Sequence, residues 1–232
     1  RALIIGPPRC GATQLMLEIS QAIQTGSPDV NLMAIAIDAR PEEVSDFRDH
    51  IKGEIASSTF DEGPSRHIQI AEIALERAKR LVEQGRDVVV LIDNLTQLAR
   101  AYNAALPGSG KTLASGIDSQ AIQRIKRFFG SARNLEGIGS LTVIATVRCD
   151  TGAPMDAHLL EELRSAASSE ILLSKEAASQ RLFPALNLSQ CQTNRTDKLQ
   201  SAATEERLSI IRTKLNSTGP NDLLEALKAL SN

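Results

Sequence analysis

Short apolar runs alternate along the chain with longer stretches in which apolar residues recur every three or four positions. The short runs predict β-strands, and a continuous run such as "DVVVLID" is typical of a strand buried on both faces of a parallel sheet. The longer stretches predict amphipathic helices. This repeated alternation predicts an α/β fold with a mainly parallel central sheet and helices on both faces.

The clearest helix has Pro64 in its first turn and Gly85 just past its end, the positions at which proline and glycine favour helix ends. We expect strands at Ala2–Ile5, Leu32–Ile37, Glu54–Thr59, Val88–Ile92, Leu141–Thr146 and Glu170–Leu173. We expect helices at Thr13–Gln24, Glu42–Lys52, Pro64–Gln84, Leu95–Tyr102, Ser119–Phe129 and Lys198–Leu215, and a last one from an Asn221 cap. Loops at Leu106–Gly116 and Thr151–Pro154 interrupt a single domain of residues 1–232 without dividing it.

Composition limits the classes of function. A formal net charge of −2 excludes a chain that is basic throughout, so any polynucleotide contact must come from a local patch or channel. Three cysteines and three histidines lack metal-ligand spacing, which favours reduced cytoplasmic thiols over a disulfide framework or a zinc site. No apolar run reaches the length of a membrane span, so no membrane partner is expected. Because Arg1 directly precedes a strand, we expect a further domain on the N-terminal side.

Two glycine-rich segments compete as the nucleotide site. The first, "IIGPPRCGATQ" (residues 4–14), follows an apolar strand and precedes a helix, so backbone N–H groups and a helix N-terminus can surround a phosphate. The second, "ALPGSGKTL" (residues 105–113), contains Gly-Lys-Thr but follows a helix, and Ala105 occupies the position of the first glycine. The context favours the first segment, although an ordinary Gly/Pro turn before a helix explains that motif equally well.

The first segment has the shape of a phosphate-binding loop but one altered side chain. Gly6 and Gly11 permit the tight turn, and Thr13 offers a hydroxyl to Mg²⁺. Ala12 stands where such a loop requires lysine, so the ammonium group that neutralises the β- and γ-phosphates is missing.

Two carboxylates end strands of the predicted sheet. Asp93 follows a buried strand, where a carboxylate that orients Mg²⁺ belongs; the alternative is that it caps the helix from Leu95. Asp38 ends the second strand. Because parallel strands present their carboxyl ends at one edge, we expect the ligand crevice there.

Longer sequence segments indicate a protein family. "ARPEEV", "KGEIASSTFDEGPSRHIQIAE", "AKRLVEQGRDVVVLIDNLTQLARAYN", "KRFFGSARN" and "GSLTVIAT" resemble the motor domain of the bacterial transcription termination factor Rho family, from Leu3 to about Phe183. The resemblance implies a RecA-like P-loop NTPase fold assembled as a hexameric ring of like subunits. It also implies ATP with Mg²⁺ between subunits, RNA through the centre, and RNA polymerase as a further partner.

The resemblance assigns roles to individual residues. It implies nucleotide binding by Gly6, Pro7, Pro8, Arg9, Cys10, Gly11, Ala12, Thr13, Gln14, Arg181 and Phe183, Mg²⁺ binding by Thr13 and Asp93, and RNA binding by Lys111, Thr112 and Arg164. Phe183 matches an aromatic that stacks on adenine, or is a core residue after a strand. Arg164 lies in the segment that would be a second pore loop, residues 150–170, but the glycines that follow this position in the family are absent here. The alternative is that Arg164 is a cation at the end of a helix.

Three arginines match groups close to the phosphates. Arg181 resembles a phosphate-sensing arginine, and Arg40 resembles one close to the γ-phosphate. Arg195 occupies the position of the trans-acting arginine finger only if one residue is inserted; otherwise that position is Asn194. Cys10 is either a thiol made reactive by the helix N-terminus or an inert small residue.

Two alanines replace catalytic groups. By the resemblance, Ala12 stands where the family has the loop lysine, and Ala39 stands where the family has the glutamate that activates the attacking water. A general base contributes about 10²–10⁴-fold, and preorganised charge is usually the largest catalytic contribution, so we expect hydrolysis to be impaired or lost. This predicts a ring subunit that binds RNA and nucleotide in transcription termination.

The alternative is an active RNA-dependent ATPase and 5′–3′ RNA–DNA helicase with relocated groups, such as Arg9 or Lys111 in place of the lysine. Deliberate inactivation would also leave alanine at both positions. The further departures in the second loop and after Phe183 favour natural divergence.

Overall fold

A computed structural model describes residues 1–106, 108, 112–196, 206 and 209. Its strands are β1 (Ala2–Gly6), β2 (Asn31–Ala39), β3 (Glu54–Thr59), β4 (Val88–Asp93), β5 (Arg133–Leu135), β6 (Gly139–Arg148), β7 (Ser169–Leu172) and β8 (Gln192–Thr193). Its helices are α1 (Ala12–Gly26), α2 (Pro41–His50), α3 (Pro64–Glu83), α4 (Leu95–Ala105), α5 (Ser119–Phe129), α6 (Pro154–Arg164) and α7 (Lys175–Ser179).

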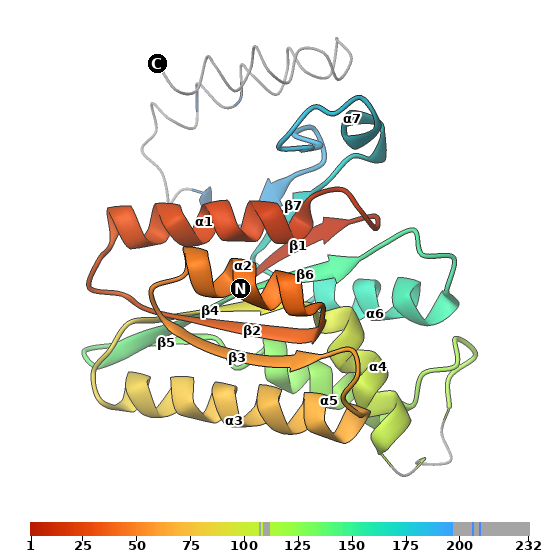
Figure 1. The fold of residues 1–232 in the computed structure, drawn as a ribbon, viewed down its shortest axis with the longest axis horizontal. Coiled ribbons are helices and arrows are strands. Elements are labelled where there is room, and N and C mark those ends of the chain that lie inside the picture. The colour runs from red at the N-terminus through yellow and green to blue at the C-terminus, as the bar shows by residue number, and fades with distance from the viewer. Residues whose placement is uncertain (107, 109–111, 197–205, 207–208, 210–232) are drawn as a thin grey trace.

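All of these strands form one sheet in the order β3-β2-β4-β6-β1-β7-β8, with β5 beside β6 (Figure 1). The six strands from β3 to β7 in this order pair in parallel, whereas β5 and β8 pair antiparallel to β6 and β7. The prediction of a mainly parallel α/β sheet is therefore confirmed.

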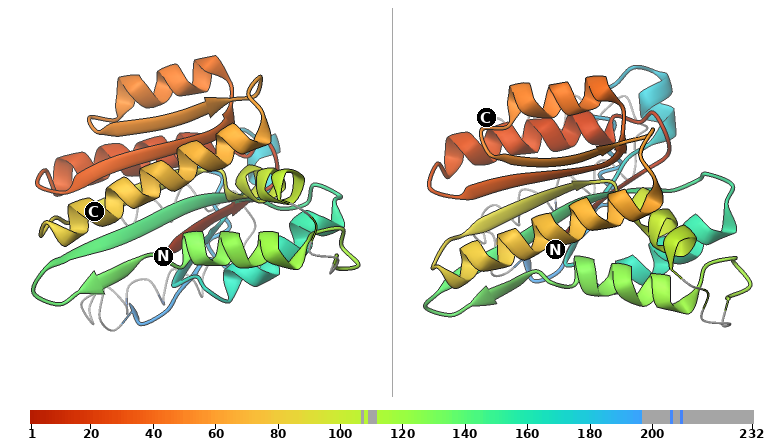
Figure 2. Two further views of the ribbon diagram at one scale, coloured as in Figure 1. Left: turned by 90° about the horizontal axis from the view of Figure 1, so that it is seen from below. Right: turned by 60° about the horizontal axis from the view of Figure 1, so that its bottom comes forward.

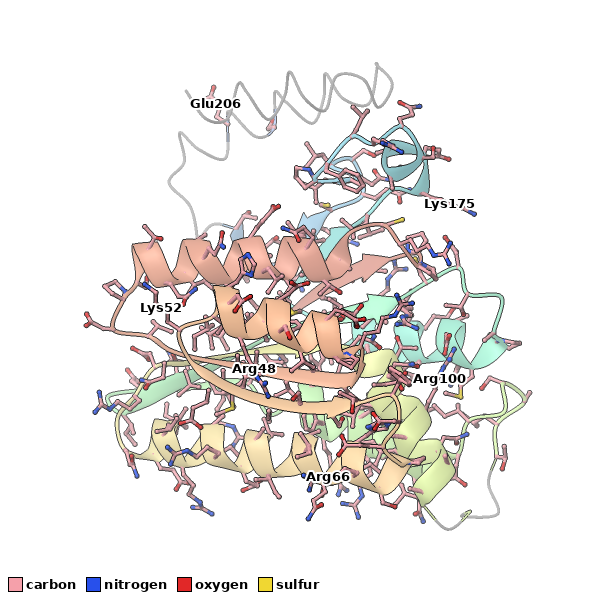
Figure 3. All side chains as sticks on the ribbon, in the orientation of Figure 1. Arg48, Lys52, Arg66, Arg100, Lys175 and Glu206 are labelled. Carbon is pink, nitrogen blue, oxygen red and sulfur yellow. The ribbon has the colours of Figure 1, made fainter. Side chains whose placement is uncertain are left out.

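Helices cover both faces of the sheet, with α1 and α2 on one face and α3, α4 and α5 on the other (Figures 1 and 2). Successive residues of a strand point to opposite faces, and the apolar runs fill both. On β4, Val90 and Ile92 belong to the core under α3–α5, while Leu91 belongs to the core under α1 and α2. Charged side chains such as Arg48, Lys52 and Arg66 remain exposed at the outer surface (Figure 3).

Most predicted elements are present, but two strands extend further than the apolar pattern indicates. Strand β6 continues to Arg148, which pairs with Gly6 at the end of β1. Strand β2 continues to Ala39, with a register shift between Ile37 and Ala39 and a positive φ of 57° at Asp38. In both cases backbone pairing continues the strand past its predicted end and includes a further buried apolar residue, Val147 in β6 and Ala39 in β2.

The sequence prediction missed α6, α7, β5 and β8. Residues 150–170 were expected to be a pore loop, but most of them form α6, because Pro154 starts the helix and Leu159, Leu160 and Leu163 are buried. The predicted helices at Lys198–Leu215 and from Asn221 fall outside the described residues, apart from Glu206 and Ser209. Within the part of the chain that is described, every helix is too short or too polar to traverse a lipid bilayer.

Truncation of Leu91 tests the central position of β4. Leu91 is fully buried, so we expect Leu91→Ala to lower the free energy of unfolding by about 2–5 kcal/mol through lost burial and a residual cavity. The matched change Leu113→Ala, at a side chain that is 39% exposed, should cost about 0.5 kcal/mol. Urea unfolding of both variants measures the difference, and equal costs would contradict the assignment of the core.

Candidate nucleotide-binding site

A cleft of about 790 Å³ opens at the carboxyl ends of the parallel strands. It is lined by residues 6–14 after β1, residues 37–40 at the end of β2, Asp93 and Asn94 after β4, and residues 146–148 at the end of β6. Four segments that are far apart in the sequence therefore meet at one place, at the sheet edge predicted for the ligand crevice.

The loop after β1 has the geometry of an anion cradle. Gly11 precedes α1 with a φ of 83°, a left-handed conformation that favours glycine. A Cβ added to Gly6 would lie 2.9 Å from Cδ1 of Leu173, so a larger residue at this position would require the Leu173 side chain to shift. The first turn of α1 contains no acidic residue, which leaves its N-terminal N–H groups suited to a negatively charged ligand.

Thr13 and Asp93 lie within hydrogen-bond distance. The hydroxyl of Thr13 donates to Oδ2 of Asp93 at 2.6 Å, and the hydroxyl of Thr146 donates to Oδ1 at 2.5 Å. Asp93 does not cap α4, because Asn94 does so: its Oδ1 accepts from the backbone N–H of Gln97 at 2.9 Å. The helix-cap alternative for Asp93 is thus wrong.

The donor set fits Mg²⁺ held together with a nucleotide. Mg²⁺ prefers hard oxygen ligands and is usually bound by one or two carboxylates together with phosphates of the substrate. Here Asp93 would provide a carboxylate and Thr13 a hydroxyl, beside the loop that would hold the phosphates. Among the described residues, no three His, Cys, Asp or Glu side chains gather as a protein-only metal cage. Gln97 also lines the cleft, and its buried Oε1 has no hydrogen-bond partner in that same part of the chain.

The two alanines that the sequence analysis singled out both line the cleft. Ala12 is the first residue of α1, and Ala39 is 6% exposed at the end of β2. Two carboxylates that follow or precede Ala39 and line the cleft already accept hydrogen bonds. Asp38 accepts a hydrogen bond from the side chain of Gln97, and Glu43 accepts one from the backbone N–H of Arg40 at 2.9 Å.

Phe183 lies over the loop and outside the core. Its side chain is 52% exposed, and a Cβ at Gly11 would lie 3.4 Å from its ring, so the core alternative is wrong. Arg181 is exposed, with a φ of 59°. Neither residue lines the cleft itself, and their contact with a nucleotide stays a prediction.

The other predicted residues are dispersed. Arg9, with a φ of 68°, and Arg40 are exposed at the rim of the cleft, whereas Asn194 and Arg195 form an exposed turn after β8. The remaining residues predicted to bind the nucleotide, Pro7, Pro8, Cys10 and Gln14, all line the cleft.

Two of the residues predicted to bind RNA, Thr112 and Arg164, do not line the cleft. Lys111 falls outside the described residues. Thr112 is exposed and pairs with Asp118 in an isolated β-bridge. Arg164 lies in the last turn of α6 and forms an ion pair with Glu170 at 3.2 Å, which is the position of the helix-end cation alternative.

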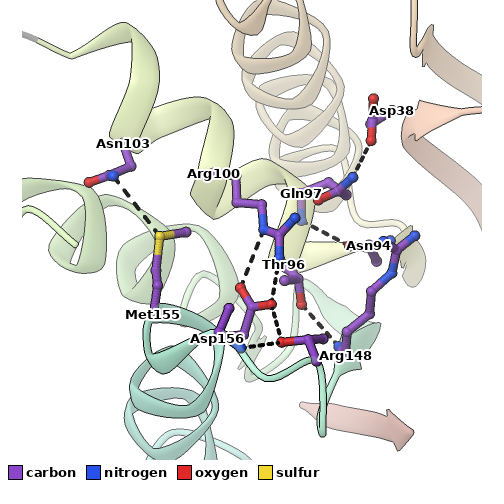
Figure 4. A network of polar contacts seen from close by, with 11 residues as sticks. Asp38, Asn94, Thr96, Gln97, Arg100, Asn103, Arg148, Met155 and Asp156 are labelled. Atoms are coloured by element: carbon purple, nitrogen blue, oxygen red, sulfur yellow. Dashed lines mark hydrogen bonds and ion pairs between the residues drawn. The ribbon is translucent and has the colours of Figure 1, made fainter. Parts of the chain in front are cut away.

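A polar network joins α4 to α6 and to the end of β6 (Figure 4). Asp156 is 2% exposed and accepts hydrogen bonds from Arg100 at 2.6 Å and from the hydroxyl of Thr151 at 2.7 Å. On the same helix as Arg100, the hydroxyl of Thr96 accepts from the backbone N–H of Arg148 at 2.9 Å. The network therefore holds the backbone between the end of β6 and the start of α6, next to the cleft. Sequence analysis did not single out Arg148, because β6 was predicted to end at Thr146.

Two cysteines near the cleft are poor nucleophiles. Cys10 is 3% exposed, and its burial raises the pKa of its thiol above the ordinary value, although Lys175 acts in the opposite direction. Burial, together with the charge of Asp150, raises the pKa of Cys149 to about 11. The alternative of Cys10 as an inert residue therefore agrees with its surroundings.

Comparisons with known proteins agree with this geometry. The model of the ATP synthase alpha/beta family, nucleotide-binding domain, matches residues 1–192. The transcription termination factor Rho of Cereibacter sphaeroides is 46% identical over 227 residues, covering 98% of this chain and 54% of that protein. The Rho factor of Borreliella burgdorferi is 47% identical over 236 residues, covering 100% of this chain and 46% of that protein. The chain spans about half the length of these curated relatives.

Solved structures share the fold at low sequence identity. An ATPase from the type III secretion system of pathogenic bacteria has a TM-score of 0.82 at 20% identity, covering 98% of this chain and 66% of that one. The assembled ATPase EscN, solved with its central stalk EscO from enteropathogenic E. coli, has a TM-score of 0.78 at 20% identity, covering 97% and 54%. The predicted RecA-like P-loop NTPase fold is confirmed.

Thiol modification tests the environment of Cys10. Because its raised pKa leaves little thiolate at neutral pH, we expect Cys10 in the folded protein to react with iodoacetamide at pH 7.5 several-fold more slowly than a free thiol. The rate should rise as the pH approaches the raised pKa. Mass spectrometry of peptides from native and urea-unfolded protein measures it, and fast labelling of the native protein at pH 7.5 would contradict this environment.

Proposed function

The chain belongs to the ATP synthase alpha/beta family and, within it, to the Rho-type transcription termination factors, and from this premise we propose that it is a ring subunit with impaired hydrolysis. It binds ATP with Mg²⁺ in the cleft, associates with like subunits in a hexamer, and contacts RNA. In this role it acts in transcription termination, with RNA polymerase as a further partner.

The observation that carries nucleotide binding is the contact between Thr13 and Asp93 beside the glycine-rich turn. The hydroxyl and the carboxylate lie 2.6 Å apart, although 80 positions separate them in the sequence. Gly6 and Gly11 keep the turn open for phosphate oxygens. This preserved geometry supports a bound triphosphate, with Thr13 and Asp93 on the ion and the N-terminus of α1 on the phosphates. The ion supplies charge neutralisation of the phosphates when it is bound.

Impaired hydrolysis rests on the missing side chains. Ala12 has no charge to stabilise the transferring phosphoryl group, and Ala39 has no carboxylate to orient the attacking water. The neighbouring carboxylates of Asp38 and Glu43 already accept hydrogen bonds from Gln97 and Arg40. In an active enzyme with a relocated base, one of the four carboxylates that line the cleft, Asp38, Glu43, Asp46 and Asp93, would take that role.

Assembly and RNA contact are proposed from the relatives. The curated relatives are named as transcription termination factors, and EscN is described as an assembled ATPase. In such a ring, Arg195 or Asn194 of one subunit would approach the cleft of the next. Lys111, Thr112 and Arg164 would approach the RNA.

Restoring both side chains tests the impaired site. We expect the full-length protein to bind a fluorescent ATP analogue in a Mg²⁺-dependent manner but to release phosphate slowly, even with RNA. The double change Ala12→Lys with Ala39→Glu should raise RNA-stimulated phosphate release by on the order of 10²–10⁴-fold, because it returns the cation and the base.

The control is the same pair of changes combined with Asp93→Asn, which should cancel the gain. Brisk RNA-dependent turnover by the unmodified protein would instead establish the active-helicase alternative. Absence of nucleotide binding up to millimolar concentration would exclude the proposed function.

The RNA contact is tested through its salt dependence. If Lys111 contacts a phosphate of single-stranded RNA, Lys111→Ala should reduce the slope of log K against log salt by about 0.7 per contact. Filter binding of a labelled oligonucleotide at several salt concentrations measures the slope. The matched change Lys52→Ala, at an exposed lysine after α2, should leave the slope unaltered, and identical slopes for all three proteins would remove Lys111 from the RNA site.

A further inference from the structure

The cleft contains an arginine that neither the sequence motifs nor the proposed roles account for. Arg148 ends β6 and lines the cleft together with residues of the glycine-rich loop. Among the described residues, three arginines and four carboxylates line this cleft, and none of its lining residues is a lysine. Within this part of the chain, arginine is the cationic side chain that can meet a triphosphate in the cleft.

The three arginines are held to different degrees. Arg9 and Arg40 are exposed at the rim, so water screens their charge. Arg148 is partly buried, and its backbone is fixed on two sides. It pairs in register with Gly6, the first glycine of the loop, and its N–H donates to the buried hydroxyl of Thr96 at 2.9 Å. Its Cα is thus held beside the start of the phosphate loop.

The guanidinium of Arg148 lacks an ion-pair partner among the described residues. Arg100 and Arg164 on neighbouring elements pair with Asp156 and Glu170, whereas Arg148 makes no ion pair within residues 1–106, 108 and 112–196. Its side chain extends from the end of β6 past Asn94 (Figure 4). A partly buried guanidinium is favoured where an oxyanion completes its hydrogen bonds, and its planar fork matches phosphate oxygens.

We propose that Arg148 supplies the cationic contact to the β- and γ-phosphates that Ala12 does not provide. The proposal rests on nucleotide binding in this cleft and adds a phosphate-binding residue to it. The charge has moved from the helix side of the loop to the end of the adjacent strand. The site therefore distinguishes nucleoside di- and triphosphates from monophosphates through Arg148.

Competition binding tests this assignment. A fluorescent ATP analogue bound to the full-length protein with Mg²⁺ is displaced by unlabelled ATP, ADP or AMP. We expect Arg148→Ala to weaken ATP and ADP binding by about 10- to 100-fold, the loss of a charge-assisted hydrogen-bonded contact, with much less effect on AMP. Arg148→Lys should retain part of the affinity, because it keeps the charge but not the fork.

Two further variants separate this role from a structural one. Arg86→Ala removes an exposed arginine just before β4, at the opposite end of that strand from Asp93, and should leave all three affinities unaltered. Ala12→Lys should restore ATP affinity in the Arg148→Ala background by a larger factor than it raises affinity in the unmodified protein, because both cations serve the same phosphates. Thermal unfolding identifies a variant that has lost its fold, and Arg148→Gln then replaces Arg148→Ala.

The outcomes distinguish the two proposals. Binding by the unmodified protein with equal affinities for Arg148→Ala and Arg86→Ala would overturn the role of Arg148 alone. Equal losses for ATP, ADP and AMP would also overturn it, since they indicate a general distortion of the cleft. If the unmodified protein binds none of the three nucleotides, both the proposed function and the assignment of Arg148 fail.

Discussion

The cleft depends on the way in which the chain leaves β1. Gly11 takes a left-handed conformation with a φ of 83°, and the turn brings the N-terminus of α1 to the end of β4. There Thr13 donates to Asp93 at 2.6 Å, while Thr146 of β6 donates to the other carboxylate oxygen. A single carboxylate thereby ties together three elements from separate parts of the sequence. Because β4 pairs with both β2 and β6, the ends of these two strands lie beside Asp93 in the cleft.

The sequence reveals features that are encoded locally. The alternation of apolar runs and helical periods predicts the parallel sheet, and the glycine spacing predicts the loop, because both depend on neighbouring residues. The position of Arg148 depends on pairing with β1. The strand was predicted to end at Thr146, but its pairing with β1 continues through the buried Val147 to Arg148, which lies opposite Gly6. The cap of α4 also depends on contacts between distant residues. Hydrogen bonds from Thr13 and Thr146 occupy both carboxylate oxygens of Asp93, and Asn94 caps the helix instead.

The place of a cation decides whether it serves binding or hydrolysis. A lysine at position 12 would lie at the phosphate loop itself, where it can stabilise the charge that develops during phosphoryl transfer. Arg148 belongs to a strand whose backbone is fixed by Gly6 and Thr96. Charge at this position neutralises phosphates in the ground state, but only interactions that strengthen in the transition state accelerate the reaction. With no carboxylate at Ala39 to orient water, tight binding and slow turnover are compatible in the same cleft.

The shape of the cleft and the chemistry proposed for it depend on different residues. The shape can therefore be kept when the side chains proposed for hydrolysis are replaced. Gly6 packs against Leu173, and Cys10 is buried in the core under α1 and α2, so changes at these positions disturb the fold. Ala39 is 6% exposed in the same core. A glutamate there would be desolvated, and alanine removes that cost. Alanine at positions 12 and 39 therefore imposes little penalty on folding, whereas loss of the glycine turn or of the hydrogen bond between Thr13 and Asp93 would disturb it. Selection for a stable fold is sufficient to preserve the cradle.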